Sequence, residues 1–286
     1  MRVSAALILS CAAGTYAWGE KAHQATGRIA QGFINKCAQK EVFGLIPENN
    51  SDIGIAATWA DTVKFTPEFA FSFGLHFIDS HDNTPIDQGK TSCTVDLLRD
   101  CANGQCIVKA ISNYTEQLDP ENNFPLKQRQ EAFKFLAHFF GDVTFQGETL
   151  APAFPDPSKP RTTPFQLHGL WDFIIPETDM AVNFNGSIAG YADDLVKRLS
   201  VGGDLRKSRH SWTTCKEPYV TKSGKKISVC PLEYSTSANV INCDTVWSGF
   251  SVRPDGKGTE DDLGFSYNDR VAPLIRKQIA MAGYRF

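Results

Sequence analysis

Two histidine–aspartate pairs in the chain have the spacing of metal-ligand pairs on a helix: His138 with Asp142, and His168 with Asp172. Residues four positions apart on a helix lie on the same face about one turn apart, so each imidazole would meet its carboxylate. Zinc binds both kinds of donor. A single pair of this kind is commonly an ordinary hydrogen-bonded pair on a solvated helix. Here two pairs flank a proline-rich segment, residues 147–165, which favours a shared site.

Three further side chains suit the same chemistry. Asp61 and His76 are embedded in apolar sequence, where a polar group without a partner would cost free energy. His23 stands close to the start of the chain. Together with the two pairs, these residues predict a site for more than one metal ion. The sequence has no His-Glu-x-x-His motif for a single zinc, and no Gly-x-Ser-x-Gly motif competes.

The elements that must position these residues are mainly helical. Apolar residues recur at helical spacing, as Phe133, Leu136, Ala137 and Phe140 do ahead of Asp142. We expect a single, mainly α domain with little β structure, a short hairpin over 219–229 and an ordered loop over 147–165. The expected helices cover residues 20–36, 51–60, 128–141, 166–176, 189–199, 231–242 and 269–282, the last ending before Gly283.

The first 17 residues have the character of a secretory signal. A basic residue precedes a short apolar run that is too short to span a membrane, and small residues follow up to Ala17. Cleavage there would leave a mature chain that starts at Trp18 and forms one domain over residues 18–286. We expect a secreted monomer with no membrane partner. Seven cysteines in the mature chain and three N-glycosylation sequons agree with an oxidising, secretory route.

The charge balance limits the classes of partner. With 29 Lys+Arg against 32 Asp+Glu, the 286-residue chain has a formal charge of −3. A protein that holds nucleic acid through a broad basic surface is therefore excluded. The charge balance does not exclude a protein that binds nucleic acid through bound metal ions, which would supply the positive charge.

Five motifs that follow one another along the chain carry a specific resemblance. They are Trp18-Gly19 with His23, Trp59-Ala60-Asp61-Thr62-Val63-Lys64, Leu75-His76-Phe77-Ile78-Asp79, His138-Phe139-Phe140-Gly141-Asp142 and His168-Gly169-Leu170-Trp171-Asp172. In these motifs the chain resembles the zinc-dependent type I nucleases, the secreted single-strand-specific enzymes of fungi and plants of the mung bean nuclease type. The resemblance extends from Trp18 to the C-terminus. It implies an α-helical bundle, a fold shared with zinc phospholipase C, with three zinc ions in a cleft.

The resemblance also assigns ligands to two adjacent zinc ions. The first would be held by Asp61, His76, His138 and Asp142. The second would be held by the free α-amine and carbonyl of Trp18, by His23, and by Asp142 as a bridge between the two ions. The α-amine becomes available only when the signal is removed.

The third zinc ion would use His168 and Asp172, and here the sequence departs from the family. Members of the family have a histidine ten residues after the one that corresponds to His138. This chain has Glu148 at that position. A glutamate oxygen binds zinc at similar distances, so Glu148 is a candidate replacement. The alternative is that Glu148 faces solvent and that the third zinc is weak or absent.

The implied activity is hydrolysis of single-stranded DNA and RNA to 5′-phosphate products, with nucleotides as further ligands and a 3′-nucleotidase activity as a possible addition. Two close zinc ions lower the pKa of a shared water, which supplies a nucleophile near neutral pH. Asp61 would also orient that water, and Lys64 would stabilise charge on the phosphate. Phe77 resembles the aromatic residue on which a base stacks, and Asp79 the carboxylate that hydrogen-bonds the base. Alternatives are a zinc phospholipase C-like phosphodiesterase, or a family member of reduced activity that serves as a secreted binding protein.

For the disulfides, the resemblance implies the pairs Cys101–Cys106 and Cys93–Cys243. The turn sequence between Cys101 and Cys106 also makes a local bridge easy. A third pair, Cys215–Cys230, is expected from proximity around the hairpin, which leaves Cys37 as the free thiol.

Overall fold

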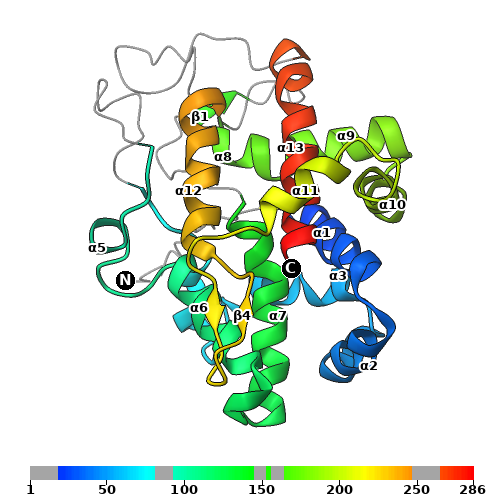
Figure 1. Ribbon diagram of the computed structural model, residues 1–286. Helices are drawn as coiled ribbons and strands as arrows, with labels where there is room; N and C mark the ends of the chain where they lie inside the picture. The colour runs from blue at the N-terminus through cyan, green and yellow to red at the C-terminus, as the bar shows by residue number, and fades with distance from the viewer. Residues whose placement is uncertain (1–18, 81–92, 145–152, 156–163, 247–264) are drawn as a thin grey trace, which may run out of the picture.

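The computed structural model describes residues 19–80, 93–144, 153–155, 164–246 and 265–286. The fold is mainly α-helical, as predicted (Figure 1). The α-helices are α1 Glu20–Phe33, α2 Lys36–Leu45, α3 Ile53–Ala56, α4 Trp59–Val63, α5 Leu97–Asp100, α6 Ile107–Leu118, α7 Leu126–Asp142, α8 Leu167–Gly169, α9 Ile175–Phe184, α10 Ile188–Leu199, α11 Arg206–Trp212, α12 Pro231–Ile241 and α13 Phe265–Arg285. No helix in the described ranges is both long and apolar enough to cross a membrane.

The β structure in the described segments consists of two short antiparallel ribbons. Strands β1 Ala153–Pro155 and β2 Pro164–Gln166 pair with Phe154 opposite Phe165. Strands β3 Tyr219–Val220 and β4 Lys226–Ile227 form the expected hairpin. The prediction of a plain loop over 147–165 is wrong where β1 and β2 pair.

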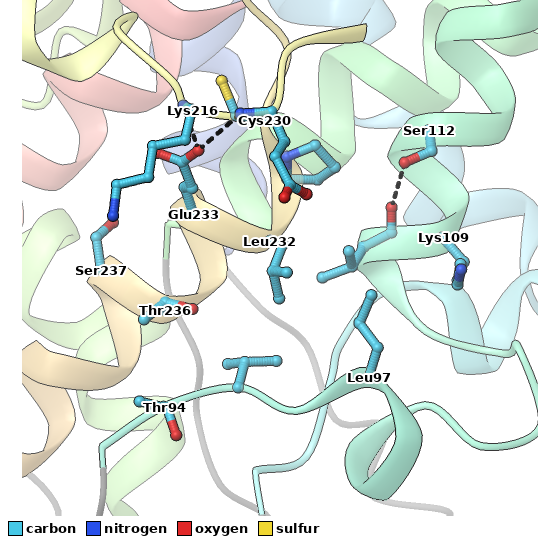
Figure 2. A pocket seen from close by; sticks show the side chains of 14 residues that line it. Thr94, Leu97, Lys109, Ser112, Lys216, Cys230, Leu232, Glu233, Thr236 and Ser237 are labelled. Carbon is cyan, nitrogen blue, oxygen red and sulfur yellow. Dashed lines mark hydrogen bonds between the residues drawn. The ribbon is translucent and has the colours of Figure 1, made fainter.

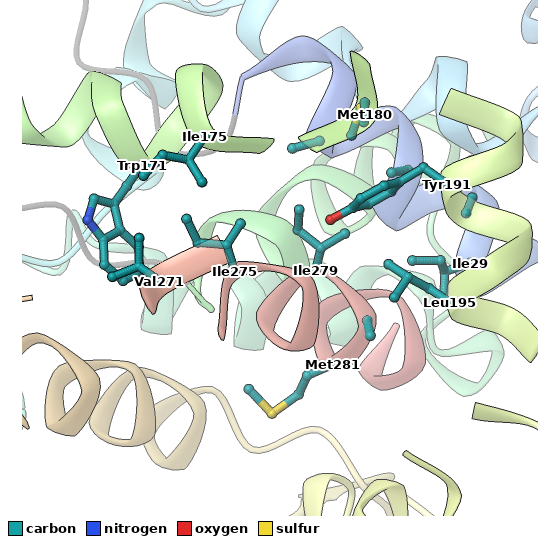
Figure 3. Packing of buried hydrophobic residues seen from close by; sticks show 14 of the residues in the cluster. Ile29, Trp171, Ile175, Met180, Tyr191, Leu195, Val271, Ile275, Ile279 and Met281 are labelled. Atoms are coloured by element: carbon teal, nitrogen blue, oxygen red, sulfur yellow. The ribbon is translucent and has the colours of Figure 1, made fainter. Parts of the chain in front are cut away.

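Two large hydrophobic clusters hold the bundle together, and a third, smaller one lies among α2, α3 and α7. In one, Val271, Ile275 and Ile279 of α13 present a buried stripe at helical spacing to residues of α1, α9 and α10 (Figure 3). In the other, α6 packs against α7 through pairs such as Tyr114 and Phe135, whose rings stack 4.6 Å apart. Helices α1, α7 and α13 contact one another between the two clusters (Figure 1).

Helix α7 is buried on every side in its second half. All eleven residues from Ala132 to Asp142 are buried, including the apolar positions predicted for the core. A helix buried all round occupies the centre of a domain. His138 and Asp142 therefore lie in the interior, not on a solvated face.

Three helix predictions need correction. Residues 51–60 form two helices, α3 and α4, instead of one. The segment 166–176 begins with the end of β2 and contains a π-helical turn, Leu170–Ile174, between α8 and α9. Helix α13 continues past Gly283, and the glycine permits a close approach of α1: an added Cβ at Gly283 would lie 2.6 Å from Cβ of Ile29.

The three expected disulfides are present: Cys93–Cys243, Cys101–Cys106 and Cys215–Cys230. Cys37 is a free, exposed thiol, as predicted. The Cys93–Cys243 bridge closes a loop of 150 residues and joins the segment before α5 to the turn after α12. Cross-links of this length restrict the unfolded chain and stabilise the fold.

Candidate metal centre

Five of the predicted ligands converge from four segments of the chain. His23 lies on α1, Asp61 on α4, His76 at the end of a 3₁₀ turn (Ala70–Leu75), and His138 and Asp142 on α7. His23, His76, His138 and Asp142 are each at most 2% exposed. Packing four ionisable groups in the interior requires partners that compensate the lost solvation.

Two histidines and two aspartates form one compact group. Nδ1 of His76 and Nε2 of His138 lie 3.0 and 3.1 Å from Oδ2 of Asp142. The two ring nitrogens are themselves 3.1 Å apart. Oδ1 of Asp61 lies 3.4 Å from the His138 nitrogen and 3.6 Å from the His76 nitrogen.

These separations fit a tetrahedral zinc site. Bonds of 2.0–2.1 Å in tetrahedral geometry separate neighbouring ligand atoms by about 3.3 Å. Five of the six pairs of donor atoms have separations of 3.0–3.6 Å, which scatter around that value. Among the described residues, the donor groups that could hold an ion are His76 with His138 and Asp142, and His23 with Asp61 and His138. Nε2 of His23 and Oδ1 of Asp142 face each other at 3.1 Å, yet neither atom has a hydrogen-bond partner in the described part of the chain. The donor set therefore suits a cation better than a closed hydrogen-bond network.

The backbone fixes the orientation of His138. Its Nδ1–H donates to the carbonyl oxygen of Ala57 at 2.6 Å, which leaves Nε2 as the atom that faces the other ligands. Hydrogen bonds of this kind set the tautomer and direction of metal-binding histidines. Ala57 stands at the break between α3 and α4. No sequence pattern marked this residue.

A second group forms on the other oxygen of Asp142. Nε2 of His23 lies 3.1 Å from Oδ1 of Asp142, and the rings of His23 and His138 stack 3.7 Å apart. The Asp142 carboxylate thus stands between His23 on one side and His76 with His138 on the other, as a bridging ligand would. Trp18 lies outside the described residues, but its neighbour Gly19 donates its N–H to the carbonyl oxygen of Asp172 at 3.0 Å.

The ionisable groups of the cluster shift one another's pKa values. Burial, with the charge on His138, lowers the pKa of His23, and burial lowers the pKa of His76 to about 4. Burial opposes a charge on His138 as well, but the carboxylates of Asp142 and Asp61 raise its pKa to about 10. Burial also opposes ionisation of those carboxylates, yet the His138 charge holds both of their pKa values well below the usual range. The two carboxylates thus face two positive charges, the His138 imidazolium and the Lys64 ammonium, whose Nζ lies 2.6 Å from Oδ1 of Asp61.

The third predicted group is only partly described. Nε2 of His168 on α8 lies 2.8 Å from Oδ2 of Asp172 in the π-helical turn. Burial raises the pKa of Asp172 to about 7. Glu148 lies outside the described residues, so the described chain supplies two of the three predicted donors here.

Lys64 belongs to the same site, although in a different role from the one expected. Its Nζ donates to Oδ1 of Asp61 at 2.6 Å, and its side chain is 1% exposed. In this arrangement the ammonium group orients and partly neutralises Asp61. Whether it also contacts a phosphate stays a prediction.

Phe77 and Asp79 follow His76 directly and are half-buried. The carbonyl oxygen of Phe77 accepts a hydrogen bond from the N–H of Ile107 at the start of α6. This bond ties the predicted base-binding segment to the rigid α6–α7 pair. Their roles in base binding stay predictions.

A cavity of about 660 Å³ lies apart from the metal ligands (Figure 2). It is lined by residues of α6, α12 and the segment around Thr94, and Glu233 accepts the N–H of Lys216 at its edge. None of the candidate ligands lines it. The chemistry of the chain is therefore concentrated at the histidine–aspartate cluster, not in this cavity.

Comparison with known proteins gives a consistent result. The S1/P1 Nuclease family model matches residues 18–145, a range that contains His23, Asp61, His76, His138 and Asp142. Nuclease S1 of Aspergillus oryzae is 31% identical over 305 residues, covering 98% of this chain and 93% of that protein. Nuclease P1 of Penicillium citrinum is 28% identical, with 94% of each chain covered. Endonuclease 2 of Arabidopsis thaliana is also 28% identical, covering 100% of this chain and 93% of that protein. The chain belongs to the S1/P1 nuclease family.

Proposed function

We propose that this nuclease is a secreted, zinc-dependent endonuclease that hydrolyses the phosphodiester bonds of single-stranded DNA and RNA. The observation that carries the proposal is the buried cluster of His76, His138, Asp61 and Asp142, in which five of the six pairs of donor atoms lie 3.0–3.6 Å apart, near the spacing of zinc ligands. Its membership of the nuclease family supports the reaction class.

Zinc ions bound here would lower the pKa of a water molecule and neutralise charge on the phosphate. The chain's own residues hold the reacting groups in place. Asp142 fixes the positions of His23 and of the His76–His138 pair on its two oxygens. Asp61, held by Lys64, would orient the attacking water.

The reaction itself is a hydrolysis that balances without a redox partner. The water oxygen adds to phosphorus, the bond from phosphorus to the 3′-oxygen breaks, and the 3′-oxygen takes a proton. The products are a 3′-hydroxyl and a 5′-phosphate. A substrate with a terminal 3′-phosphate would meet the same groups, which is the basis for a 3′-nucleotidase activity.

Preference for single strands would come from the base pocket. Stacking on Phe77 with a hydrogen bond to Asp79 requires a base whose face and edge are accessible, and paired bases offer neither. A phospholipid head group would make no use of these two residues, which separates this proposal from the phospholipase alternative.

The experiment that tests the function compares three substrates with the purified mature chain in zinc. We expect rapid hydrolysis of denatured DNA, much slower hydrolysis of the same DNA as a duplex, and no hydrolysis of phosphatidylcholine. Hydrolysis of phosphatidylcholine alone would favour the phospholipase alternative. Binding of single-stranded DNA without turnover would favour the binding protein of reduced activity.

For the N-terminus, we propose that the domain spans residues 18–286 and begins at Trp18 after removal of residues 1–17. Its α-amine and carbonyl would complete the second zinc site with His23 and Asp142. The hydrogen bond from the N–H of Gly19 to the carbonyl oxygen of Asp172 supports this placement, because it holds the residue that follows Trp18 beside a candidate zinc ligand. The three disulfides support an extracellular location.

For the third zinc ion, we propose that Glu148 completes the site with His168 and Asp172. A second carboxylate in place of a histidine adds negative charge and would weaken the stabilisation of the phosphate. Glu148→Ala should lose one zinc ion and lower turnover on single-stranded DNA by roughly a hundredfold. Glu148→His should keep three ions and raise turnover above wild type.

The measurement is zinc content and turnover for each variant, with Glu217→Ala as the control because Glu217 is an exposed glutamate at the rim of the separate cavity. Full zinc content and full turnover in Glu148→Ala would show that Glu148 is not a ligand.

A further inference from the structure

Two exposed phenylalanines stand beside the metal centre. Phe65 follows α4 and is 53% exposed, and Phe73 lies in the 3₁₀ turn before His76 and is 39% exposed. Their ring centroids are 6.2 Å apart at an interplanar angle of 64°. Single exposed apolar side chains are normal on protein surfaces. Together the two rings form an exposed, angled aromatic surface, which we call the notch.

The notch is connected to the metal ligands through Lys64. Nζ of Lys64 lies 5.6 Å from the centroid of the Phe65 ring and 5.8 Å from that of the Phe73 ring. The same Nζ donates to Oδ1 of Asp61 at 2.6 Å, and that oxygen lies 3.4 Å from Nε2 of His138. The cation–π contacts hold both rings against a group that is itself fixed by a candidate zinc ligand. The position of the notch relative to the metal centre is therefore set by packing.

We propose that Phe65 and Phe73 form a second base-stacking subsite, which holds an unpaired nucleobase next to the nucleotide that is cleaved. The inference rests on the proposed nuclease function and extends it beyond the pocket of Phe77 and Asp79. A flat, apolar ring with polar edges suits the notch, because it can stack on one phenylalanine and contact the edge of the other. The repeat along one strand is about 3.4 Å per nucleotide in a stacked helix and longer when extended. A nucleotide one or two positions from the metal centre is therefore within reach of the notch.

The occupant is a base of the substrate strand, not a lipid or a protein partner. The notch adjoins Lys64 and Asp61, so a substrate bound at the metal centre passes it, whereas a partner docked there would obstruct the site. Every base has a face that stacks, so the subsite would bind all four bases with little discrimination. It would also exclude a duplex, in which both faces of each base are covered by its neighbours.

The test separates binding from chemistry with substrates that do or do not fill the subsite. The double variant Phe65→Ala/Phe73→Ala should raise KM for a single-stranded decathymidylate by roughly tenfold to a hundredfold, with kcat changed little. Its activity on thymidine 3′-(methyl phosphate), a phosphodiester with only one base, should equal that of wild type. Phe65→Trp should keep the KM of wild type, because it preserves a stacking face.

Phe71→Ala is the matched control. Phe71 is 57% exposed on the same segment, but it packs toward Phe69 and Phe135 instead of Lys64. Zinc content and unfolding temperature are measured for each variant to confirm that the fold is retained. An unchanged KM on decathymidylate in the double variant, or an equal loss on the one-base substrate, would overturn the proposal while leaving the nuclease function intact. Lack of activity of the wild type on both substrates would instead contradict the proposed function.

Discussion

Replacement of Asp142 by asparagine should lower turnover on single-stranded DNA by roughly a thousandfold or more. The two carboxylate oxygens face different partners, with His23 3.1 Å from Oδ1, and with His76 and His138 3.0 and 3.1 Å from Oδ2. Asparagine has the same shape but no charge, and one of its two polar atoms is a donor. The variant would therefore weaken two metal sites at once. The change is measured as kcat on denatured DNA and as bound zinc per chain.

Asp119→Asn is the matched control for this variant. Asp119 is also buried, at 5% exposure, and accepts hydrogen bonds from the hydroxyl of Tyr219 and the N–H of Glu121. It should lose some stability and keep its zinc and its turnover. If Asp142→Asn and Asp119→Asn were equally active, Asp142 would not bridge two metal ions.

Removal of the metal ions should destabilise the fold as well as stop catalysis. When the free zinc concentration is a thousand times the dissociation constant of a site, binding at that site contributes about 4 kcal/mol to the free energy of unfolding. For a chain of this size that corresponds to roughly 8 °C in the unfolding temperature for each ion. Chelation would also leave the carboxylates and imidazoles of the cluster in the interior without the ions that they would hold.

The measurement is the unfolding temperature of the mature chain with saturating zinc and after long incubation with excess chelator. Asp142→Asn supplies an internal control, because a chain that has already lost its tightest ions should respond less to the chelator. The same unfolding temperature for wild type in both conditions would show that the cluster does not depend on metal. Peptide mapping of the disulfides on the same samples would confirm that the chelator has not changed the covalent structure.

The sequence predicted the centre of this site well because its strongest signal is local. The i,i+4 spacing of His138 and Asp142 depends only on helix geometry, and the apolar residues before them indicated a buried helix. The structure confirms both features in α7. The structure also brings Asp61 and His76 close to His138 and Asp142, and their apolar surroundings in the sequence had implied burial and a partner.

What the sequence could not predict depends on contacts between distant segments. The carbonyl oxygen of Ala57 accepts a hydrogen bond from His138, 81 residues away, and the chain breaks between α3 and α4 at that point. Lys64 donates to Asp61, a contact that no sequence pattern indicated. In the same way, Gly283 lies within α13 where α1 leaves no room for a side chain, so this glycine serves close packing and does not end the helix. Local propensity contains none of this information.

The π-helical turn at Leu170–Ile174 is a further case. The spacing of His168 and Asp172 predicted a regular helix, but Asp172 lies in the wider turn. Wider turns of this kind occur often at functional sites, because they redirect one side chain within a helix. Here the turn directs Asp172 to a distance of 2.8 Å from His168, and its carbonyl oxygen accepts the N–H of Gly19.

The central claim is that the nuclease activity resides in zinc ions held by this cluster, and one titration tests it most directly. Zinc is added back to chelated chain whose first residue has been identified as Trp18, and bound zinc and turnover on single-stranded DNA are measured at each step. We predict no turnover at zero zinc, recovery as the first two ions bind, and a further increase as a third ion binds. Full turnover at zero zinc, or no specific zinc binding by a chain that is fully active, would contradict the account.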